Sequence, residues 1–330
     1  MIKKMSKLYF IINPKAGNGK AKLIWSVLEK KLISSKIQFM AFFTEKNGHG
    51  KQLAAHIIDN TDENVITIIV VGGDGTLNEV INGSSYKLEN VRIGLIPGGS
   101  GNDFSRGFSI PSDPDDALKV LLRLVKQEVP SFDVGKIIID DNREHFFINS
   151  TGAGFDALIS YEANHSSWKG LLNRFSLGQF VYVILLLKNL FTFKCSTVDL
   201  IINGKKQTFP KTWFVTVSNQ PYYGGGMKIA PHALANDGEL NVTVVHNLSR
   251  LKLLLVFLSV FWGKHLGFKE VNHFLARTIS IQSSEPFFVH SDGEPIGSTP
   301  LQISIHPEPI SILTRQCLVE IQQEKEMNIK

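Results

Sequence analysis

Cysteine is scarce in this chain of 330 residues, and no apolar run approaches the length of a membrane span. The two cysteines, Cys195 and Cys317, lie far apart and form no CxxC or metal-binding spacing. This argues against a disulfide framework or a zinc site and is typical of a reducing cytoplasm. The longest apolar stretches, Val181–Leu187 and Leu253–Trp262, fall far short of the ~20 residues that cross a bilayer. The sequence therefore predicts a protein that does not cross a membrane.

Acidic residues are rare at the beginning of the chain. Residues 1–46 contain ten lysines and only two acids, Glu29 and Glu45, whereas the whole chain has a net charge of +5. A basic segment of this kind suits an anionic partner such as a nucleotide or an anionic lipid surface, and it equally suits a solvated lysine face. We expect no nucleic-acid partner, because the basic residues lack interleaved aromatic side chains and any known nucleic-acid-binding module.

The first third of the chain alternates between strand-like and helix-like segments. Val65–Val71 is an uninterrupted β-branched run, which is typical of a strand buried on both faces of a parallel sheet. The other expected elements are strands at Leu8–Ile12, Phe39–Phe43 and Val91–Ile96, and helices at Ala21–Leu32, Lys51–Ile58, Leu77–Asn82 and Asp115–Lys126. This order predicts an open α/β sheet covered by helices.

The pattern changes after Asp133, where strand-like runs follow one another. These runs are Gly135–Ile139, His145–Asn149, Thr197–Ile202, Trp213–Ser218, Leu240–Val245, Thr278–Gln282, Phe287–Ser291 and Gln302–His306. Asn203-Gly204 marks a hairpin turn between two of them, and we expect helices at Gln179–Leu190 and Arg250–Lys264. The sequence therefore predicts an α/β nucleotide-binding domain at residues 1–134 and a β-rich, β-sandwich-like domain at residues 135–310. Residues 311–330 can return to the first domain.

The expected helix at Arg250–Lys264 contains large apolar residues with helical spacing. They are Leu253, Leu254, Phe257, Leu258, Phe261 and Trp262. Such a set suits a core face or the wall of an acyl-chain cleft, and we expect the core face.

Glycine-rich loops follow three of the expected strands. Residues 72–76 (GGDGT) follow Val65–Val71 and precede a helix, and residues 97–104 and 13–20 follow two other strands. Glycines let backbone N–H groups approach a polyphosphate closely, and a helix N-terminus adds partial positive charge. Because open α/β sheets bind ligands at the carboxyl ends of their strands, we expect the three loops to converge on one site.

The loop at residues 72–76 has a simpler interpretation as well. It suits an ordinary glycine-rich turn in which Asp74 caps the following helix. It is neither a Walker A loop nor a dinucleotide-binding fingerprint, because Ala21 rather than Ser or Thr follows Gly19-Lys20, and Gly73-x-Gly75 lacks the third glycine. A nucleotide site built on these loops therefore belongs to another class.

The sequence resembles the diacylglycerol-kinase catalytic family, which includes bacterial lipid kinases and sphingosine kinases. The resemblance begins with Asn13-Pro14…Gly17, GGDGTLNEV at 72–80 and PGGSGNDFSR at 97–106, and it continues through 132–135, 149–155, 224–230, 233–240 and 291–294. NAD kinases and phosphofructokinases share a GGDG loop, but the GGSGNDF loop points to the lipid kinases. The resemblance implies an NAD-kinase-like or diacylglycerol-kinase-like α/β domain followed by a β-rich domain, with the active site in the cleft between them.

This resemblance also implies ATP as co-substrate and Mg²⁺ as its metal. The positions that match ATP-contacting residues are Asn13, Pro14, Lys15, Ala16, Gly17, Thr44, Gly72, Gly73, Asp74, Gly75, Thr76, Leu77, Asn78 and Ser100. Asp292 matches the proposed general base that accepts the proton of the lipid hydroxyl, with Glu294 close by. Asp133 matches a buried acidic position tied to the magnesium network. Taken by itself, the Ser-Asp-Gly-Glu sequence at 291–294 also suits a type I turn.

Residues 234–239 (LANDGE) resemble a bacterial lipid-kinase metal site. The resemblance implies a cation held by the Asp237 carboxylate and by the backbone carbonyls of Leu234 and Glu239. Such an oxygen-only set suits a hard cation. The alternative is an Asp-Gly turn at the end of a strand.

We expect a cytoplasmic lipid kinase, peripheral at the inner membrane surface and in transient contact with it. Its acceptor is a hydroxyl of a membrane lipid, most simply diacylglycerol or a related lipid alcohol, with a sphingoid base, phosphatidylglycerol and an isoprenoid alcohol also open. Two other classes stay open: an NAD-kinase-like phosphotransferase on a soluble nucleotide, and a regulator that binds ATP without turnover. The sequence leaves the oligomeric state undecided, with a homodimer among the alternatives.

Overall fold

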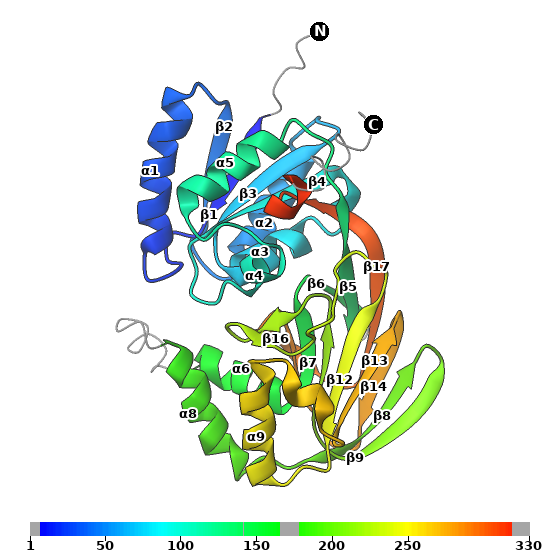
Figure 1. Ribbon diagram of the computed structural model, residues 1–330. Helices are drawn as coiled ribbons and strands as arrows, with labels where there is room; N and C mark the ends of the chain where they lie inside the picture. Colours follow the sequence, from blue (N-terminus) through cyan, green and yellow to red (C-terminus); the bar gives the residue numbers. More distant parts are fainter. Residues whose placement is uncertain (1–6, 141, 166–177, 319–330) are drawn as a thin grey trace, which may run out of the picture. The chain divides into compact units, whose positions relative to one another are not determined.

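The computed structural model describes residues 7–140, 142–165 and 178–318 and divides the chain into two compact units (Figure 1). The first unit comprises residues 1–132 and 308–330, and the second comprises residues 133–307. The chain passes between the units within two strands, β5 (Ser131–Ile139) and β17 (Leu301–Ile312). Of the segment 311–330, residues 319–330 lie outside the described part of the chain. Among the described residues, no helix is both long and apolar enough to cross a membrane.

A parallel sheet forms the centre of the first unit. Its strands β1 (Leu8–Ile12), β2 (Phe39–Phe43), β3 (Ile66–Gly72) and β4 (Val91–Pro97) lie in the order β4-β3-β1-β2, and the end of β17 lies parallel beside β4. Every residue of β3 is buried, which confirms the prediction from its β-branched run. The chain places β2 on one side of β1 and β3 on the other. The loops after β1 and β3 therefore flank the switch point at which such sheets bind ligands.

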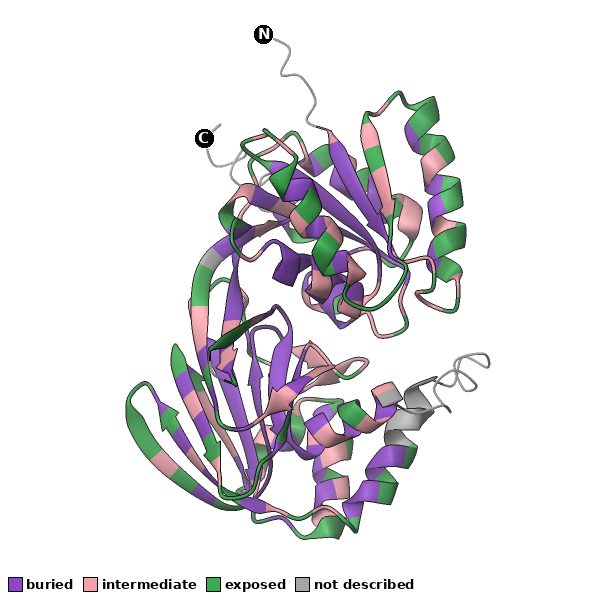
Figure 2. Ribbon diagram, turned by 180° about the vertical axis from the view of Figure 1, so that it is seen from behind, coloured by how far each residue is buried: buried purple, intermediate pink, exposed green. Residues whose placement is uncertain are grey.

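Helices cover this sheet (Figure 2). Strands β1, β3 and β4 are almost wholly buried, the edge strand β2 is partly exposed, and the outer sides of the helices are exposed. They are α1 (Lys20–Ser34), α2 (His49–Asp59), α3 (Asp74–Gly83) and α5 (Pro114–Leu124), all four of which the sequence predicts. The buried Trp25 of α1 packs its ring 5.0 Å from that of Phe10 in β1. Helix α5 starts where the Asp113 carboxylate accepts the N–H groups of Asp115 and Asp116, with a proline at the first helical position.

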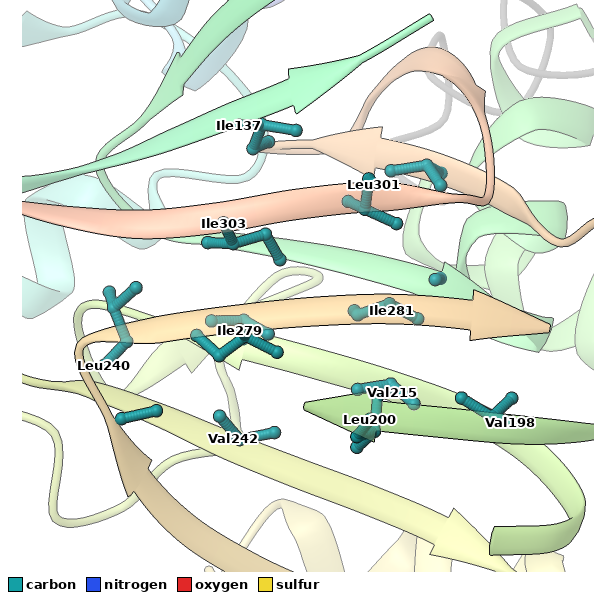
Figure 3. Close-up of a cluster of buried hydrophobic side chains, with 14 of the residues drawn as sticks. Ile137, Val198, Leu200, Val215, Leu240, Val242, Ile279, Ile281, Leu301 and Ile303 are labelled. Carbon is teal, nitrogen blue, oxygen red and sulfur yellow. The ribbon is translucent and has the colours of Figure 1, made fainter. Parts of the chain in front are cut away.

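The second unit is built from antiparallel strands, so the predicted α/β-plus-β-rich architecture is confirmed. Besides β5 and β17, these strands are β6 (Arg143–Phe147), β7 (Ser150–Gly154), β8 (Ser196–Ile202), β9 (Lys205–Ser218), β10 (Tyr222–Tyr223), β11 (Met227–Lys228), β12 (Leu240–His246), β13 (Val271–Ala276), β14 (Thr278–Ser283), β15 (Phe288–Ser291) and β16 (Glu294–Ser298). The first half of β9 pairs with β8, and its second half pairs with both β7 and β12. A core that includes Leu200, Val215, Val242 and Ile281 fills the interior (Figure 3).

Three helices of the second unit are α6 (Phe155–His165), α8 (Gly178–Leu190) and α9 (Arg250–Val260). Residues of all three join one buried cluster with Trp213 and Phe214 of β9. The sequence does not predict α6, nor the five-residue helix α4 (Asp103–Gly107) of the first unit. Helix α4 has only five residues, and α6 starts directly after β7 without a loop between them, so neither shows a separate apolar period in the sequence.

The prediction that the apolar residues around α9 form a core face is wrong for half of them. Leu253 is buried, but Leu258, Phe261 and Trp262 are exposed, and Leu254 and Phe257 are partly buried against the core. The physical reason is that α9 is apolar around its whole circumference, so spacing alone does not identify the side that packs. The packed side is Leu253, Val256 and Val260.

Candidate active site

The three glycine-rich loops of the first unit meet through their backbones. The carbonyl of Gly72, at the end of β3, accepts the N–H groups of Gly98 (2.7 Å) and Gly99 (3.1 Å). A Cβ atom on Gly99 would lie 2.5 Å from the Cα of Gly73, and one on Gly17 would overlap the Gly98 carbonyl oxygen. Gly17 also has a φ of 56°, in the left-handed region that favours glycine. The loops after β1, β3 and β4 thus converge, and only glycine permits an approach this close.

Asp74 ties the second of these loops to the third. Its Oδ2 accepts the N–H of Asp103 at 2.9 Å, and its Oδ1 accepts the N–H of Phe104 at 3.2 Å. These N–H groups belong to the first turn of α4, where a carboxylate also complements the helix dipole. The alternative interpretation of this loop, in which Asp74 caps the helix that follows it, is therefore wrong: α3 begins after Gly73 without a side-chain cap.

Asn13 and Lys15 connect the first loop to its neighbours. The Asn13 side-chain amide donates to the Thr76 hydroxyl at 3.0 Å, and the Lys15 ammonium donates to the backbone carbonyl of Glu45 at 3.1 Å. Thr44 donates its N–H to the carbonyl of Ile12 at 2.8 Å. Asn13, Lys15, Thr44 and Thr76, which the sequence places at ATP-contacting positions, are therefore neighbours in the structure.

The remaining predicted nucleotide residues differ in their exposure. Ser100 is exposed at the tip of the third loop, whereas Leu77 and Asn78 are buried in α3. The side-chain amide oxygen of Asn78 (Oδ1) accepts from the Asn82 side-chain amide at 3.2 Å. A helix start without a side-chain cap, three glycine-rich loops and the ammonium of Lys15 together make a surface that favours a polyphosphate.

In the second unit, the predicted base Asp292 lies in a two-residue hairpin between β15 and β16. Both Asp292 (φ 48°) and Gly293 (φ 86°) have left-handed backbones, as in a type I′ turn, so the type I alternative is wrong. The Asp292 carboxylate accepts three N–H groups, from Ile148 (3.0 Å), Asn149 (2.9 Å) and Ser150 (2.9 Å). These bonds stabilise the ionised carboxylate and hold it against the start of β7. Glu294 is half-buried at the first position of β16.

Helix α6 holds this hairpin from behind, through residues that the sequence analysis does not identify. Ser160 and Asn164 donate to the carbonyl of Gly293 at 2.6 and 3.0 Å. The buried His290 accepts the Gly293 N–H at its Nδ1 atom (3.2 Å), so in the neutral ring Nε2 carries the proton and faces Asp156 Oδ2 at 3.4 Å. Asp156, Ser160 and Asn164 are spaced four residues apart. This spacing places the three polar side chains on the side of α6 that contacts the hairpin. The spacing could have identified them from the sequence only if α6 had been predicted as a helix.

The predicted metal position at residues 234–239 is a turn that Asp133 organises. Asp133 is fully buried; its N–H donates to the Ala235 carbonyl (2.7 Å) and its carboxylate accepts the Gly238 N–H (2.8 Å). Asp237 accepts the N–H of Glu239 at 3.0 Å. Burial raises the pKa of the Asp237 carboxyl, and the Asp133 and Glu239 carboxylates raise it further, although the Glu239 N–H opposes the shift.

This electrostatic environment suits a cation, because two acids, Asp133 and Glu239, lie near the Asp237 carboxyl, whose charge is disfavoured. A cation at the turn would find the Asp237 carboxylate and backbone carbonyls, the oxygen donors that hard cations prefer. In the described part of the chain, no three His, Cys, Asp or Glu side chains come together as a metal-binding group. A cation here would therefore depend on carbonyl oxygens, as the sequence resemblance implies.

Two family models match the chain, one for each unit. The model of the diacylglycerol kinase catalytic domain matches residues 7–137, and that of the YegS C-terminal NAD kinase beta sandwich-like domain matches residues 149–314. The chain is 33% identical to YtlR of Bacillus subtilis (strain 168), a protein named as a lipid kinase on a provisional basis, over 94% of this chain and 100% of that protein. It is 32% identical to a protein of Staphylococcus aureus (strain MRSA252) named diacylglycerol kinase, over 88% of this chain and 86% of the other.

Solved structures share the fold. One from Bacillus anthracis str. Sterne superposes with a TM-score of 0.72 at 24% sequence identity, over 96% of this chain and 99% of that chain. A second, described as a diacylglycerol kinase from the same organism, has a TM-score of 0.65 at 21% identity over 95% and 98% of the two chains. At these identities the similarity establishes the fold of this chain.

Replacing Asp74 by alanine removes both acceptors from the first turn of α4. We expect Asp74→Ala to lose about 1–2 kcal/mol of unfolding free energy, as cap removal does. It should also bind ATP roughly tenfold or more weakly, a change of about 1.4 kcal/mol, because the third loop loses its tie to α3. Calorimetric ATP titration and urea denaturation measure the two effects.

Asp113→Ala is the matched control for this variant. Asp113 caps α5 through two N–H bonds of 3.0 Å each, outside the three loops. It should lose a similar amount of stability and keep its ATP affinity. Equal losses of ATP affinity in the two variants, or unchanged affinity in Asp74→Ala, would contradict the role given to Asp74.

Asp237→Asn tests the turn at residues 234–239. A carboxyl whose pKa is raised by folding contributes stability below its unfolded pKa, and this contribution is lost as pH rises through the folded value. The substitution should therefore raise the melting temperature at neutral pH in metal-free buffer. Added Mg²⁺ or Ca²⁺ should raise the melting temperature of the wild type and leave that of Asp237→Asn unchanged.

Asp199→Asn provides a control of opposite sign in the same unit. Hydrogen bonds from Lys206 and Thr208 lower the pKa of Asp199, so its removal should lower the melting temperature at neutral pH. The cation response of this variant should equal that of the wild type. A cation response that survives in Asp237→Asn would rule out the turn as the binding position.

Proposed function

Because this chain belongs to the diacylglycerol-kinase catalytic family, we propose that it transfers the γ-phosphoryl group of ATP to a hydroxyl group of a membrane lipid, with diacylglycerol or a related lipid alcohol as the acceptor. The observation that carries the proposal is the backbone convergence of the three glycine-rich loops beside the uncapped start of α3. N–H groups and a helix N-terminus at one edge of a parallel sheet suit a nucleotide polyphosphate.

Phosphoryl transfer depends mainly on positioning and on neutralising the charge of the phosphate oxygens. In our proposal the loops of the first unit hold the polyphosphate through backbone N–H groups, and Lys15 and Thr76 contribute an ammonium and a hydroxyl. Mg²⁺ bound with the nucleotide supplies further charge neutralisation. The Asp74 carboxylate maintains the arrangement by holding α4 and the third loop.

In this proposal Asp292 acts as the general base for the lipid hydroxyl group. The lipid hydroxyl oxygen forms a bond to the γ-phosphorus, its proton passes to the Asp292 carboxylate, and the bond from the γ-phosphorus to the bridging oxygen breaks to release ADP. Three backbone N–H bonds orient the carboxylate, and the hydrogen bonds of Ser160 and Asn164 to Gly293 steady the hairpin. His290 and Asp156 support the same hairpin without contact to the reacting atoms in this scheme.

A panel of acceptors tests the reaction directly. We expect the purified chain to transfer ³²P from [γ-³²P]ATP to at least one of diacylglycerol, sphingosine, phosphatidylglycerol and an isoprenoid alcohol in mixed micelles, and only when Mg²⁺ is present. NAD belongs in the panel, because the second family model describes an NAD kinase beta sandwich-like domain. If NAD but no lipid became labelled, the protein would be a nucleotide kinase and the proposed function would be wrong. If the protein bound ATP but labelled no acceptor, it would be a regulator that binds ATP without turnover.

Asp292→Asn tests the proposed base, but the structure indicates that this substitution also lowers the stability of the fold. An asparagine oxygen can still accept from Asn149 and Ser150, whereas its NH₂ group would face the N–H of Ile148, another donor. We expect this mismatch to cost about 1–3 kcal/mol of unfolding free energy. Loss of the base should lower turnover ~10²–10⁴-fold while ATP affinity stays unchanged.

Ser160→Ala is the control that separates chemistry from hairpin placement. It removes the 2.6 Å hydrogen bond to Gly293 and keeps the Asp292 carboxylate. We expect a comparable loss of stability with a much smaller loss of turnover, measured on the same lipid at several pH values. Similar turnover in Asp292→Asn and Ser160→Ala would mean that the hairpin position matters and that Asp292 is not the base.

A further inference from the structure

Helix α9 and the turn that follows it expose a stripe of large apolar side chains. Leu251, Leu255 and Leu258 are spaced by four and three residues, so they lie along one side of α9, and Trp262 follows four residues later in the turn after the helix. Leu251 is 72% exposed and Trp262 is 70% exposed. The opposite side of α9, with Leu253, Val256 and Val260, is packed into the core. The helix is therefore held firmly by one apolar side and presents the other to solvent.

Helix α8 carries a second stripe of the same kind. Ile184, Leu187 and Phe191 are spaced by three and four residues and are all exposed. The helix is joined to α9 by a hydrogen bond of 3.1 Å from Arg250 Nε to the Leu190 carbonyl, and the two helices share one buried cluster. Figure 1 shows α8 and α9 as neighbours at one end of the second unit. We call the two stripes together the α8–α9 face.

The stretches of sequence that carry this face are poor in acidic residues. From Asn241 to Lys269 the sequence contains no Asp or Glu, and from residue 163 to residue 198 it contains none either. Lys252 is neutralised by Glu270 at 2.6 Å and Lys188 faces Glu162 at 3.1 Å. Arg250 and Lys264 are exposed cations in the acid-free stretch that contains α9. The face thus combines exposed apolar stripes with flanking positive charge.

A cavity of about 450 Å³ opens where α9 begins. Its apolar walls include Phe193, Trp213 and Leu248. Among the described residues its polar lining includes the exposed cations Lys194, Lys211 and Arg250 but no acid. An apolar pocket edged by three cations suits an amphiphile whose head group is negative. This cavity is a second observation, separate from the stripes, and it points to the same chemistry.

We propose that the α8–α9 face docks the protein on bilayers that contain anionic phospholipids, with its apolar stripes in the interfacial layer and the cations of the cavity on lipid phosphate groups. Tryptophan and leucine beside lysine and arginine are the composition of helices that lie in a membrane surface. Two copies of this face would bring like charges together, which disfavours self-association as the use of the stripes. The inference rests on the proposed function, because a kinase that acts on a membrane lipid must reach a bilayer.

Vesicle sedimentation of the full chain tests the docking surface. We expect binding to vesicles of phosphatidylcholine with phosphatidylglycerol to exceed binding to phosphatidylcholine alone and to weaken as salt is added. A Leu255→Gln/Trp262→Gln variant should lose on the order of tenfold or more in partitioning. Ile33→Gln in α1 is the matched control, since Ile33 is exposed to nearly the same extent as Leu255 (63% and 61%) and lies in the other unit. Its partitioning should equal that of the wild type.

The contribution of the cavity has its own variant. Lys194→Gln/Lys211→Gln should reduce the preference for phosphatidylglycerol, whereas Lys30→Gln/Lys126→Gln, two exposed lysines of the first unit, removes the same charge and should preserve that preference. If both double variants lost this preference equally, the preference would depend on net charge alone, and the proposed role of the cavity would be wrong. Light scattering of the same samples reports self-association, and a change in oligomeric state without a change in vesicle binding would assign the face to a second copy.

Turnover measurements separate this inference from the proposed function. With dioctanoylglycerol dispersed in water as the acceptor, Leu255→Gln/Trp262→Gln should keep wild-type turnover, and with long-chain diacylglycerol in vesicles its turnover should fall with its binding. Wild-type protein that binds vesicles but phosphorylates no lipid would contradict the proposed function and leave the docking face standing. Lipid phosphorylation together with unchanged vesicle binding by the variant would refute the docking face.

Discussion

Carboxylates that accept backbone N–H groups from distant segments hold the candidate site residues of each unit in place. Asp74 accepts from residues 29 and 30 positions later in the chain, and Asp292 accepts from residues 142 to 144 positions earlier. Glu79 does the same for Gly48 and Gly50 at the start of α2. Hydrogen bonds with an ionised acceptor are roughly twice as strong as neutral ones, so each carboxylate fixes a loop that would otherwise have few constraints.

This arrangement ties chemistry to stability. Asp292 occupies the position of a base and at the same time satisfies three N–H groups at the start of β7. An N–H group that loses its acceptor in a partly buried place costs about 1–3 kcal/mol. A substitution at such a residue therefore changes geometry together with proton transfer, and the two effects separate only against a variant that disturbs the hairpin without touching the carboxylate.

The second unit also joins a polar hairpin to an apolar surface through one layer of helices. The polar stripe of α6 holds the Gly293 carbonyl, while α8 and α9 bury one apolar side each and expose another. The hydrophobic effect has no direction, so a helix that is apolar on both sides can pack on a core and still favour a membrane surface. The cations around α9 then select which surface is favourable, because they attract anionic lipid and repel a second copy.

Local patterns in the sequence determined the strands β1 to β4 and the helices α1, α2, α3 and α5 of the first unit, the hairpin at Asn203-Gly204 and the convergence of three glycine-rich loops. These features depend on neighbours within a few residues: β-branched runs report burial, and glycines report the backbone freedom that close contact requires. The sequence resemblance also identified the family and the candidate residues Asp74, Asp237 and Asp292. The tertiary structure alone decided which N–H groups these carboxylates meet, that the Asp292 turn is of type I′, that α6 stands behind it and which side of α9 is exposed. Each of these depends on the register of segments far apart in the chain, and local periodicity carries no information about that register.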